Sequence, residues 1–169
     1  MIGTLLCTAI CCAVVAGQQQ TPVPPETHQF DFWVGKWKAS GDSYAPNGTK
    51  THTDAENTIT RAFDGHVVQE NFTMGSFKGM SVSVYDPRVK AWRQTWVDNQ
   101  GGYIPLSGNL TDGKMTLQTP TRPTNPKASN RMIFSNIKAE SFDWDWEATA
   151  DGGTTWKLSW HLHYTRVKE

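Results

Sequence analysis

This chain of 169 residues has little cysteine and no excess of charge of either sign. Its three cysteines, Cys7, Cys11 and Cys12, all precede residue 18, so the rest of the chain has no thiol for a disulfide bond or for catalysis. Sixteen basic and sixteen acidic residues give a net charge of zero, and the basic residues form no cluster. We therefore expect no nucleic-acid partner, because such proteins carry a basic patch.

The signatures of common enzyme and cofactor sites are also missing. The sequence contains no Gly-x-Ser-x-Gly elbow, no phosphate-binding loop and no dinucleotide fingerprint. His161 and His163 lie two residues apart, so one strand could present both to a metal, but no third ligand follows at a suitable spacing. We therefore predict neither a metal site nor a cofactor. The sequence carries no indication of the oligomeric state.

The N-terminal segment has no charged side chain. Residues 1–17 are apolar or small throughout and are too few for a comfortable membrane span. Val14 and Ala16 fit the small-residue pattern before a cleavage site, so we expect a signal peptide, export to the periplasm or the exterior, and no membrane contact after its removal. A short membrane anchor is the alternative, because residues 1–17 lack the lysine or arginine that usually begins a signal peptide. The polar, proline-rich residues 18–29 are expected to form a tether.

The remainder, residues 30–169, shows no apolar stripe of helical period and is punctuated by turn signals instead. The segments between these turns are rich in β-branched and aromatic residues, which is typical of strands. The expected strands are 32–40, 52–62, 66–74, 79–85, 91–98, 103–109, 114–119, 129–136, 141–149 and 155–167. Ten strands joined by short turns predict one all-β domain, an antiparallel up-and-down barrel, because closure removes exposed edges.

Side chains alternate across a strand, which predicts what faces the barrel interior. The expected inward residues are Trp156, Leu158, Trp160, Leu162 and Tyr164 on the last strand, Phe142, Trp144, Trp146 and Ala148 on 141–149, and Trp92, Gln94, Trp96 and Asp98 on 91–98. The opposite face of the last strand then carries His161 and His163. Eight tryptophans in one chain imply a packed interior or a ligand cavity.

The strand 66–74 brings a carboxylate into the same interior. Its more apolar face holds His66, Val68, Glu70, Phe72 and Met74. A buried carboxylate needs a partner or a raised pKa. Arg61 and Arg131 are candidate partners, although nothing in the sequence fixes either contact.

Two resemblances bear on the fold. Gly35-Lys36-Trp37 on the first strand resembles the Gly-x-Trp signature of lipocalins and their calycin relatives. That resemblance implies that Trp37 closes the barrel floor and that Arg166 of the last strand packs across it, a structural role.

A closer resemblance covers nearly the whole domain. It rests on residues 30–37, Tyr85-Asp86-Pro87, residues 92–98, residues 151–156 and Tyr164-Thr165-Arg166, which occur in this order. This pattern is similar to a family of small bacterial exported proteins of unknown function with a lipocalin-like barrel. The resemblance implies a fold and export but no reaction.

The segment from Thr149 to Trp156 also resembles the Asp-box of sialidase propellers. One copy does not make a propeller, which needs several blades with a repeat period. We therefore interpret it as a hairpin turn stabilised by Asp151, which would accept hydrogen bonds from nearby backbone amides.

Three functions are compatible with such a barrel. The first is binding of a small apolar or aromatic molecule in a cavity lined by Glu70, Tyr85, Gln94, Trp96, Trp144, Trp146, Trp160 and Tyr164. The alternative is that these rings pack the interior and leave no cavity, because small barrels are often filled by their own side chains.

The other two functions require particular side chains. An acid–base enzyme, such as an isomerase or cyclase, would use Glu70 or Asp98 as the base and Tyr85 or Tyr164 as the proton donor. A haem-binding barrel resembling nitrobindin would require a histidine that points inward, against the alternation of the last strand.

Overall fold

The computed structural model describes residues 22–168. The expected signal peptide, residues 1–17, and the first four residues of the expected tether lie outside this range. The described chain forms a 3-10 helix, η1 (Pro25–Trp33), followed by the strands β1 (Gly35–Tyr44), β2 (Lys50–Ala62), β3 (Val67–Met74), β4 (Phe77–Asp86), β5 (Ala91–Asp98), β6 (Tyr103–Thr111), β7 (Lys114–Gln118), β8 (Ser129–Ser135), β9 (Ser141–Thr149) and β10 (Lys157–Arg166).

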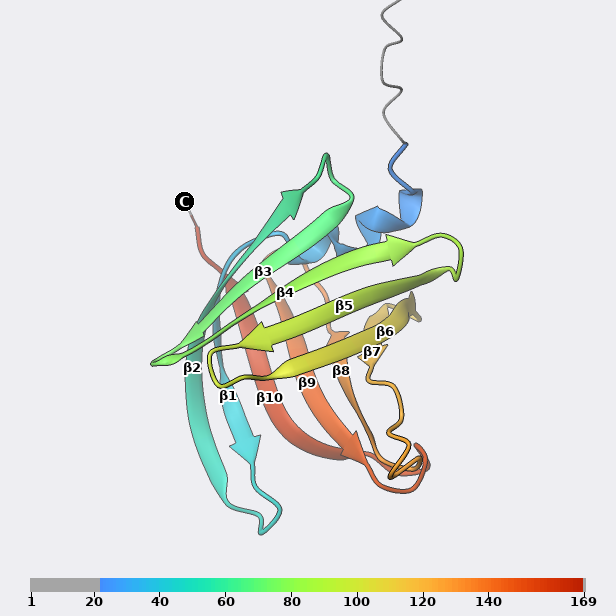
Figure 1. Cartoon of the computed structure of the whole chain (residues 1–169). Coiled ribbons are helices and arrows are strands. Elements are labelled where there is room, and N and C mark those ends of the chain that lie inside the picture. The colour runs from blue at the N-terminus through green and yellow to red at the C-terminus, as the bar shows by residue number, and fades with distance from the viewer. Residues whose placement is uncertain (1–21, 169) are drawn as a thin grey trace, which may run out of the picture.

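The strands form one closed antiparallel barrel (Figure 1). Each strand pairs with the next along the chain, and β10 returns to pair with β1, with Trp37 opposite Arg166. The predicted all-β, lipocalin-like barrel is thereby confirmed. Two predicted strands, 91–98 and 141–149, coincide with β5 and β9. The hydrophobic core lies inside the barrel.

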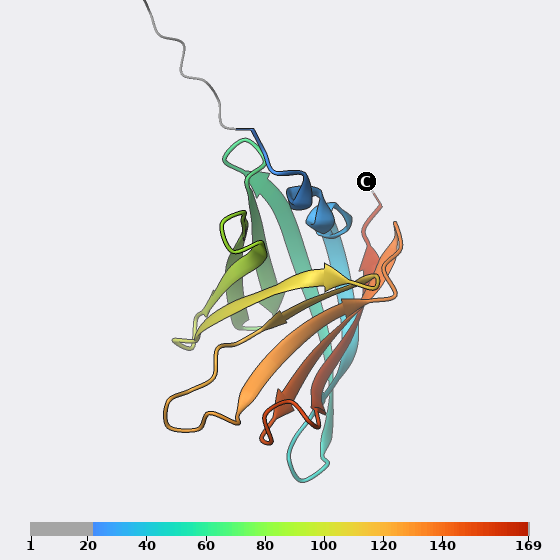
Figure 2. The same ribbon diagram turned by 90° about the vertical axis from the view of Figure 1, so that its right-hand side faces the viewer.

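The predicted first strand, 32–40, begins too early. Residues up to Trp33 belong to η1, which lies across one end of the barrel (Figure 2), and β1 starts only at Gly35. A proline at the start of η1 favours helical backbone angles, and Phe30 and Trp33, one turn apart, are both buried. Residues 25–29, which we expected in the tether, form the first part of this helix.

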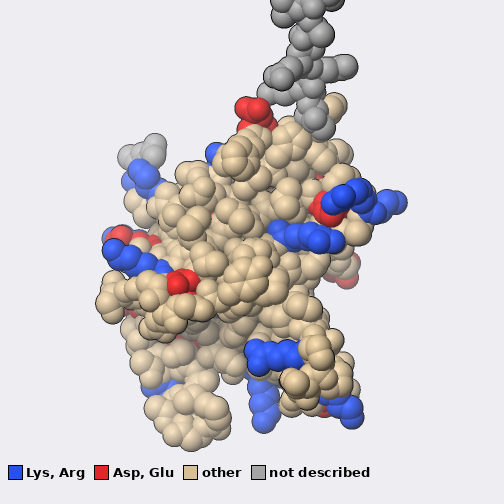
Figure 3. All heavy atoms as spheres, in the orientation of Figure 1, with Lys and Arg blue, Asp and Glu red and all other residues tan. Residues whose placement is uncertain are grey.

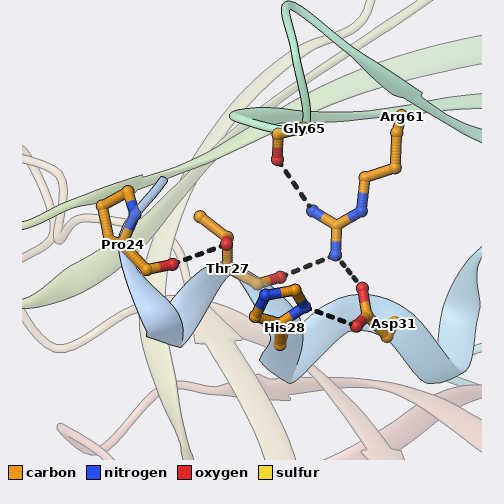
Figure 4. Close-up of polar contacts among 6 residues, drawn as sticks. All are labelled: Pro24, Thr27, His28, Asp31, Arg61 and Gly65. Atoms are coloured by element: carbon orange, nitrogen blue, oxygen red, sulfur yellow. Dashed lines mark hydrogen bonds and ion pairs between the residues drawn. The ribbon is translucent and has the colours of Figure 1, made fainter. Parts of the chain in front are cut away.

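Polar contacts of Arg61, near the end of β2, fix η1 to this strand and to the turn that follows it (Figure 4). The Arg61 guanidinium donates to the Thr27 carbonyl oxygen at 2.7 Å and to the Gly65 carbonyl oxygen at 3.2 Å, and it pairs with the Asp31 carboxylate. His28 Nδ1 lies 2.8 Å from the same carboxylate. Burial alone would raise the pKa of Asp31, but the His28 and Arg61 contacts lower it on balance.

The closed end of the barrel is a solid cluster of rings. Trp37 is 1% exposed, and its Nε1 donates to the Trp33 carbonyl oxygen at 2.8 Å. The Arg166 guanidinium covers the Trp37 ring at 4.1 Å and donates to the Phe32 and Val34 carbonyl oxygens at 3.0 and 2.8 Å. This places the terminal-strand arginine across the signature tryptophan.

Gly35 has a backbone reason to be glycine. Its φ is +136°, and a Cβ there would collide with the Arg166 guanidinium. The glycine therefore makes room for the contact between Arg166 and Trp37.

The predicted inward face of the last strand is wrong at its start. A β-bulge between Leu158 and Trp160 shifts the register against β9, so Leu158 is 40% exposed. Trp156 precedes β10; its ring lies 4.0 Å from the Arg131 guanidinium, and its Nε1 donates to the Gly153 carbonyl oxygen at 3.1 Å. The alternation holds from Trp160 onward.

The turn between β9 and β10 is organised by Asp151. Its carboxylate accepts hydrogen bonds from the Thr155 amide at 2.9 Å, the Thr155 hydroxyl at 2.6 Å and the Thr149 hydroxyl at 2.8 Å. These bonds, led by those from Thr155, lower the pKa of Asp151. Asp151 thus acts as a turn-stabilising residue.

The outer surface carries histidines and mixed charges. His161 and His163 each place Nδ1 2.6 Å from a carboxylate oxygen, of Asp145 and Asp143 respectively. On the face shown in Figure 3, lysine and arginine are interspersed with acidic and uncharged side chains. Between residues 22 and 168, no three metal-ligating side chains come together in a metal-binding arrangement. Over the same residues, no helix is long and apolar enough to cross a membrane.

Candidate functional site: an aromatic cavity in the open half of the barrel

A cavity of about 210 Å³ lies in the half of the barrel away from the solid ring cluster. Its floor includes Trp33 of η1 and Phe134 of β8, and its walls come from strands on opposite sides of the barrel. The aliphatic part of the lining is Ile104, Leu106, Met132 and Leu162. The cavity is larger than the roughly 150 Å³ that suffices to bind benzene in an engineered protein core.

Most of the predicted ligand-binding residues meet at this cavity. The lining includes Glu70, Trp96, Asp98, Trp144, Trp146, Trp160 and Tyr164. Gln94 is buried, at 2% exposure, but it is not part of the lining. Tyr85 does not line the cavity: it packs edge-on against Trp92, with ring centroids 5.9 Å apart. Tyr85 is buried, but it lies beside Trp92 at the end of the barrel that η1 covers.

The rings around the cavity stand at steep angles to one another. Trp160 is nearly perpendicular to Phe72 (88°, centroids 6.0 Å apart) and to Trp144 (89°, 5.5 Å). Phe72 is tilted by 67° to Trp96 at 6.0 Å. We call these four residues, Phe72, Trp96, Trp144 and Trp160, the aromatic cage. The three tryptophans are half-buried, whereas Phe72 is buried.

Gly79, which sequence reasoning missed, sets the position of Trp96. A Cβ on Gly79 would overlap the six-membered part of the Trp96 ring, so the ring lies against the β4 backbone. The Trp96 Nε1 donates to Asp98 Oδ2 at 3.0 Å. A glycine inside a strand signals a close approach of another group, but it does not identify that group.

Asp98 is a turn-capping residue at the rim of the cavity. Its Oδ1 accepts from the backbone amides of Gln100 and Gly102, both at 2.9 Å. The Gly102 amide, then Trp96 and the Gln100 amide, lower the pKa of Asp98. This direction is opposite to the raised pKa expected for a buried base, so Asp98 does not suit that role.

Glu70 is the buried acid of the cavity. Its two carboxyl oxygens accept hydrogen bonds from Asn57 Nδ2 at 2.7 Å and from Ser81 Oγ at 2.6 Å. Burial raises the pKa of Glu70, although these two bonds act against the shift. Neither candidate arginine reaches it: Arg61 holds η1, and Arg131 pairs with a β9 glutamate at 2.6 Å. The neutral partners follow from strand register, because Ser81 lies directly opposite Glu70.

The hydrogen bonds continue from Glu70 across the inner face. Gln94 Nε2 donates to the hydroxyls of Ser81 and Ser83, at 3.1 and 3.0 Å. Gln94 Oε1 and Asn57 Oδ1 are buried and accept no hydrogen bond from any described residue. We call Asn57, Glu70, Ser81, Ser83 and Gln94 the polar network. It ends in two unused acceptor atoms.

Tyr164 lies beside this network at the cavity wall. It is 3% exposed. Burial and the nearby Glu70 carboxylate raise the pKa of its phenol, so it is a neutral hydroxyl at physiological pH.

Two of the indole nitrogens at the cavity are buried. Nε1 of Trp33 and of Trp160 are buried without a partner in the described chain. The accessible part of Trp160 is therefore apolar.

The cavity lining has a marked charge composition. Its titratable side chains are two acids, Glu70 and Asp98, and one tyrosine; within the described chain no lysine, arginine or histidine lines it. His161 and His163, the histidines considered for haem, bind aspartates on the outer face instead. The inward histidine that a nitrobindin-like site requires is thus not supplied by β10.

Comparison with known proteins identifies the family of this chain. A family model described as a protein of unknown function, DUF1579, matches residues 24–166. The chain belongs to the DUF1579 family. The match to this DUF1579 chain spans η1 and all ten strands of the described structure. No curated protein sequence matches it.

Solved structures resemble this DUF1579 barrel at low identity. An S-type phycobiliprotein lyase, CPES from Guillardia theta, aligns with a TM-score of 0.57 and 12% identity over 84% of this chain and 92% of the other. Rv2717c from M. tuberculosis aligns with a TM-score of 0.61 and 12% identity over 87% of this chain and 100% of the other. At this identity the likeness shows a shared fold.

Proposed function

We propose that this barrel binds a small, largely apolar or aromatic molecule in the cavity. The observation that carries the proposal is a hollow of about 210 Å³ walled by half-buried tryptophans, inside a barrel whose other end is packed solid. Ligand sites are typically apolar and aromatic concavities with a few convergent polar groups. Glu70 and Tyr164 supply such groups here. The shared barrel of a phycobiliprotein lyase supports the use of this fold to act on another molecule.

Tryptophan fluorescence tests this proposal, because the reporters line the site. Titration with a panel of indoles, naphthalenes, fatty acids and sterols is expected to give saturable changes with at least one class. Replacing Ile104, which lines the cavity, by Trp fills the space and should abolish the response. The matched control is Val97→Trp on the outward face of neighbouring β5, which should leave binding intact. Flat titrations with every class would reject the proposal.

Export is the second part of the proposal. Residues 1–17 form an apolar stretch that ends in small residues, which fits the apolar region and the cleavage site of a signal peptide. Expression of the full chain followed by N-terminal sequencing of the mature protein should show cleavage near Ala16 or Gly17. An uncleaved, membrane-associated product would favour the anchor instead.

A second candidate function rests on one residue. Glu70 is a buried acid with a raised pKa beside Tyr164, an arrangement also suited to acid–base catalysis such as isomerisation or cyclisation. If the barrel turns over a ligand found in the fluorescence screen, Glu70→Gln should abolish turnover while retaining binding of an apolar ligand. Unchanged turnover in that variant would remove Glu70 from the mechanism.

A further inference from the structure

We propose that the cavity selects an organic cation, a protonated or quaternary amine with apolar substituents, held in the aromatic cage between Glu70 and Asp98. This inference rests on the proposed function, since it names the class of ligand. It is drawn from the charge of the lining, the ring geometry and the position of the two acids.

The charge of the lining favours a cation over an anion. The cavity lining contains two carboxyl groups, those of Glu70 and Asp98, and the described lining offers no cationic side chain to pair with them. An anionic ligand would face these acids without a counter-charge. Burial favours the protonated form of Glu70, and its hydrogen-bond donors Asn57 and Ser81 are neutral. A cationic ligand would supply the missing counter-charge and would thereby favour the carboxylate.

The ring geometry favours a compact onium group. A cation is attracted to the face of an aromatic ring within about 6 Å of its centroid, and sites for quaternary ammonium groups are built from several such faces. Trp160 packs edge-on against both Phe72 and Trp144, and all four rings of the cage border the cavity, so they present surfaces of different orientation to a bound group. Because Nε1 of Trp160 is buried, its apolar ring surface remains for contact.

The two acids flank the cage along their strands. Glu70 and Phe72 lie two residues apart on the same face of β3, which corresponds to about 7 Å along a strand. Asp98 stands in the same relation to Trp96 on β5, and it lies at the rim beside the turn after that strand. A cation in the cage would thus have one acid on its inner side and one at the entrance, where negative charge also attracts cations from solution.

The polar network supplies further acceptors on the inner side. The unused Gln94 Oε1 and Asn57 Oδ1 both belong to residues that are 2% exposed. Amide oxygens without donors strengthen the negative potential of this side of the barrel. That potential stabilises a permanent cation, which has no hydrogen to donate.

Three probes of nearly equal size separate charge from shape. They are benzyltrimethylammonium, its uncharged carbon isostere neopentylbenzene, and the anion phenylacetate, each titrated by calorimetry and tryptophan fluorescence against the purified full-length protein. We expect the cation to bind at least tenfold more tightly than the isostere, and the anion most weakly. Glu70→Gln should reduce the affinity for the cation about tenfold and leave that for the isostere unchanged.

A matched control removes the same charge from the outside. Glu56 lies at an exposed position of the adjoining strand β2, and Glu56→Gln should not change the affinity for any probe. Thermal unfolding establishes that each variant is folded. If Glu70→Gln does not fold, Trp160→Leu serves instead. It removes one ring of the cage and should reduce the affinity for the cation more than the affinity for the isostere.

The outcomes distinguish the two proposals. Equal or tighter binding of the isostere or the anion would overturn the selection of cations and leave a ligand-binding barrel. Failure of all three probes, with a hit elsewhere in the broader panel, would overturn it equally. Flat responses to every compound in both experiments would overturn ligand binding itself.

Discussion

The two ends of the barrel use the same kinds of side chain to opposite effect. At the closed end, Trp37 and Trp92 are 1% and 0% exposed, and their indole nitrogens donate to the Trp33 carbonyl oxygen and to Gln29 Oε1. At the open end, Trp144 and Trp160 are only half-buried and border a cavity. An abundance of tryptophan is therefore no measure of a binding site; what matters is whether the rings are already covered.

The difference has a local cause. Residues Phe30 and Trp33 of η1 enter one end of the barrel and complete the packing there, with Phe30 edge-on against Trp92 at 4.5 Å. The loops at the other end connect strands without inserting a comparable helix (Figure 1). Rings that would pack against such a helix are left facing the cavity.

The largest expected effect comes from truncating one tryptophan at each end. Trp37→Ala should lower the free energy of unfolding by about 3–5 kcal/mol, because it removes a buried ring and leaves a cavity. Trp146→Ala at the cavity wall should lower it by about 1 kcal/mol, in the range of substitutions that disturb no closed packing. Urea unfolding measures both. Equal losses would show that the two ends are packed alike.

A smaller loss of stability is expected from a substitution at Gly79, where the Trp96 ring lies against the backbone of β4. Gly79→Ala introduces a Cβ into the Trp96 ring and should destabilise the protein by about 1–3 kcal/mol, as overpacking does. It should also shift the tryptophan emission and weaken ligand binding, since Trp96 must move. Lys78→Ala, at the neighbouring exposed position of β4, is the control and should change neither property. Unaltered emission in the glycine variant would place Trp96 elsewhere.

The pH dependence of stability should distinguish the buried acid from a turn acid. The pKa of Glu70 is raised above its ordinary value of 4.5, so above that pH the unfolded chain releases a proton that the folded chain retains. The stabilisation from Glu70 is therefore complete below about pH 4.5 and is lost as the pH rises through the folded pKa.

Comparison with a neutral variant isolates the contribution of Glu70 to the pH dependence of stability. Relative to Glu70→Gln, the wild type should lose stability between pH 4.5 and neutrality in urea titrations at several pH values. Relative to Asp151→Asn, it should instead gain stability as the pH rises, because hydrogen bonds from Thr155 lower the pKa of Asp151. A wild type that becomes more stable than Glu70→Gln with rising pH would contradict the burial of a carboxyl group that has only neutral partners.

The period of two along the strands made much of this arrangement predictable from sequence. Alternation on residues 91–98 and 141–149 was sufficient to place Trp96 and Trp144 inside, because both segments are regular strands throughout. It failed for Leu158, since the β-bulge that follows reverses the alternation and has no signature in the sequence.

Other features depend on tertiary contacts that alternation does not encode. Helix η1 is too short to show a helical period, and its anchoring by Arg61 joins segments 30 residues apart. The same contact removes Arg61 as a partner for Glu70. That Ser81 is the partner instead follows from the pairing of β3 with β4, which had to be known residue by residue.

A crystal structure determined under xenon pressure tests the contrast between the two ends most directly. Xenon occupies apolar cavities of sufficient size and leaves close-packed cores empty. We predict xenon density in the open half, beside Phe72 and Trp160, and none among Phe30, Trp37 and the other rings of the closed end. Density at the closed end, or a cavity filled by the side chains of the cage, would contradict a barrel that is solid at one end and hollow at the other.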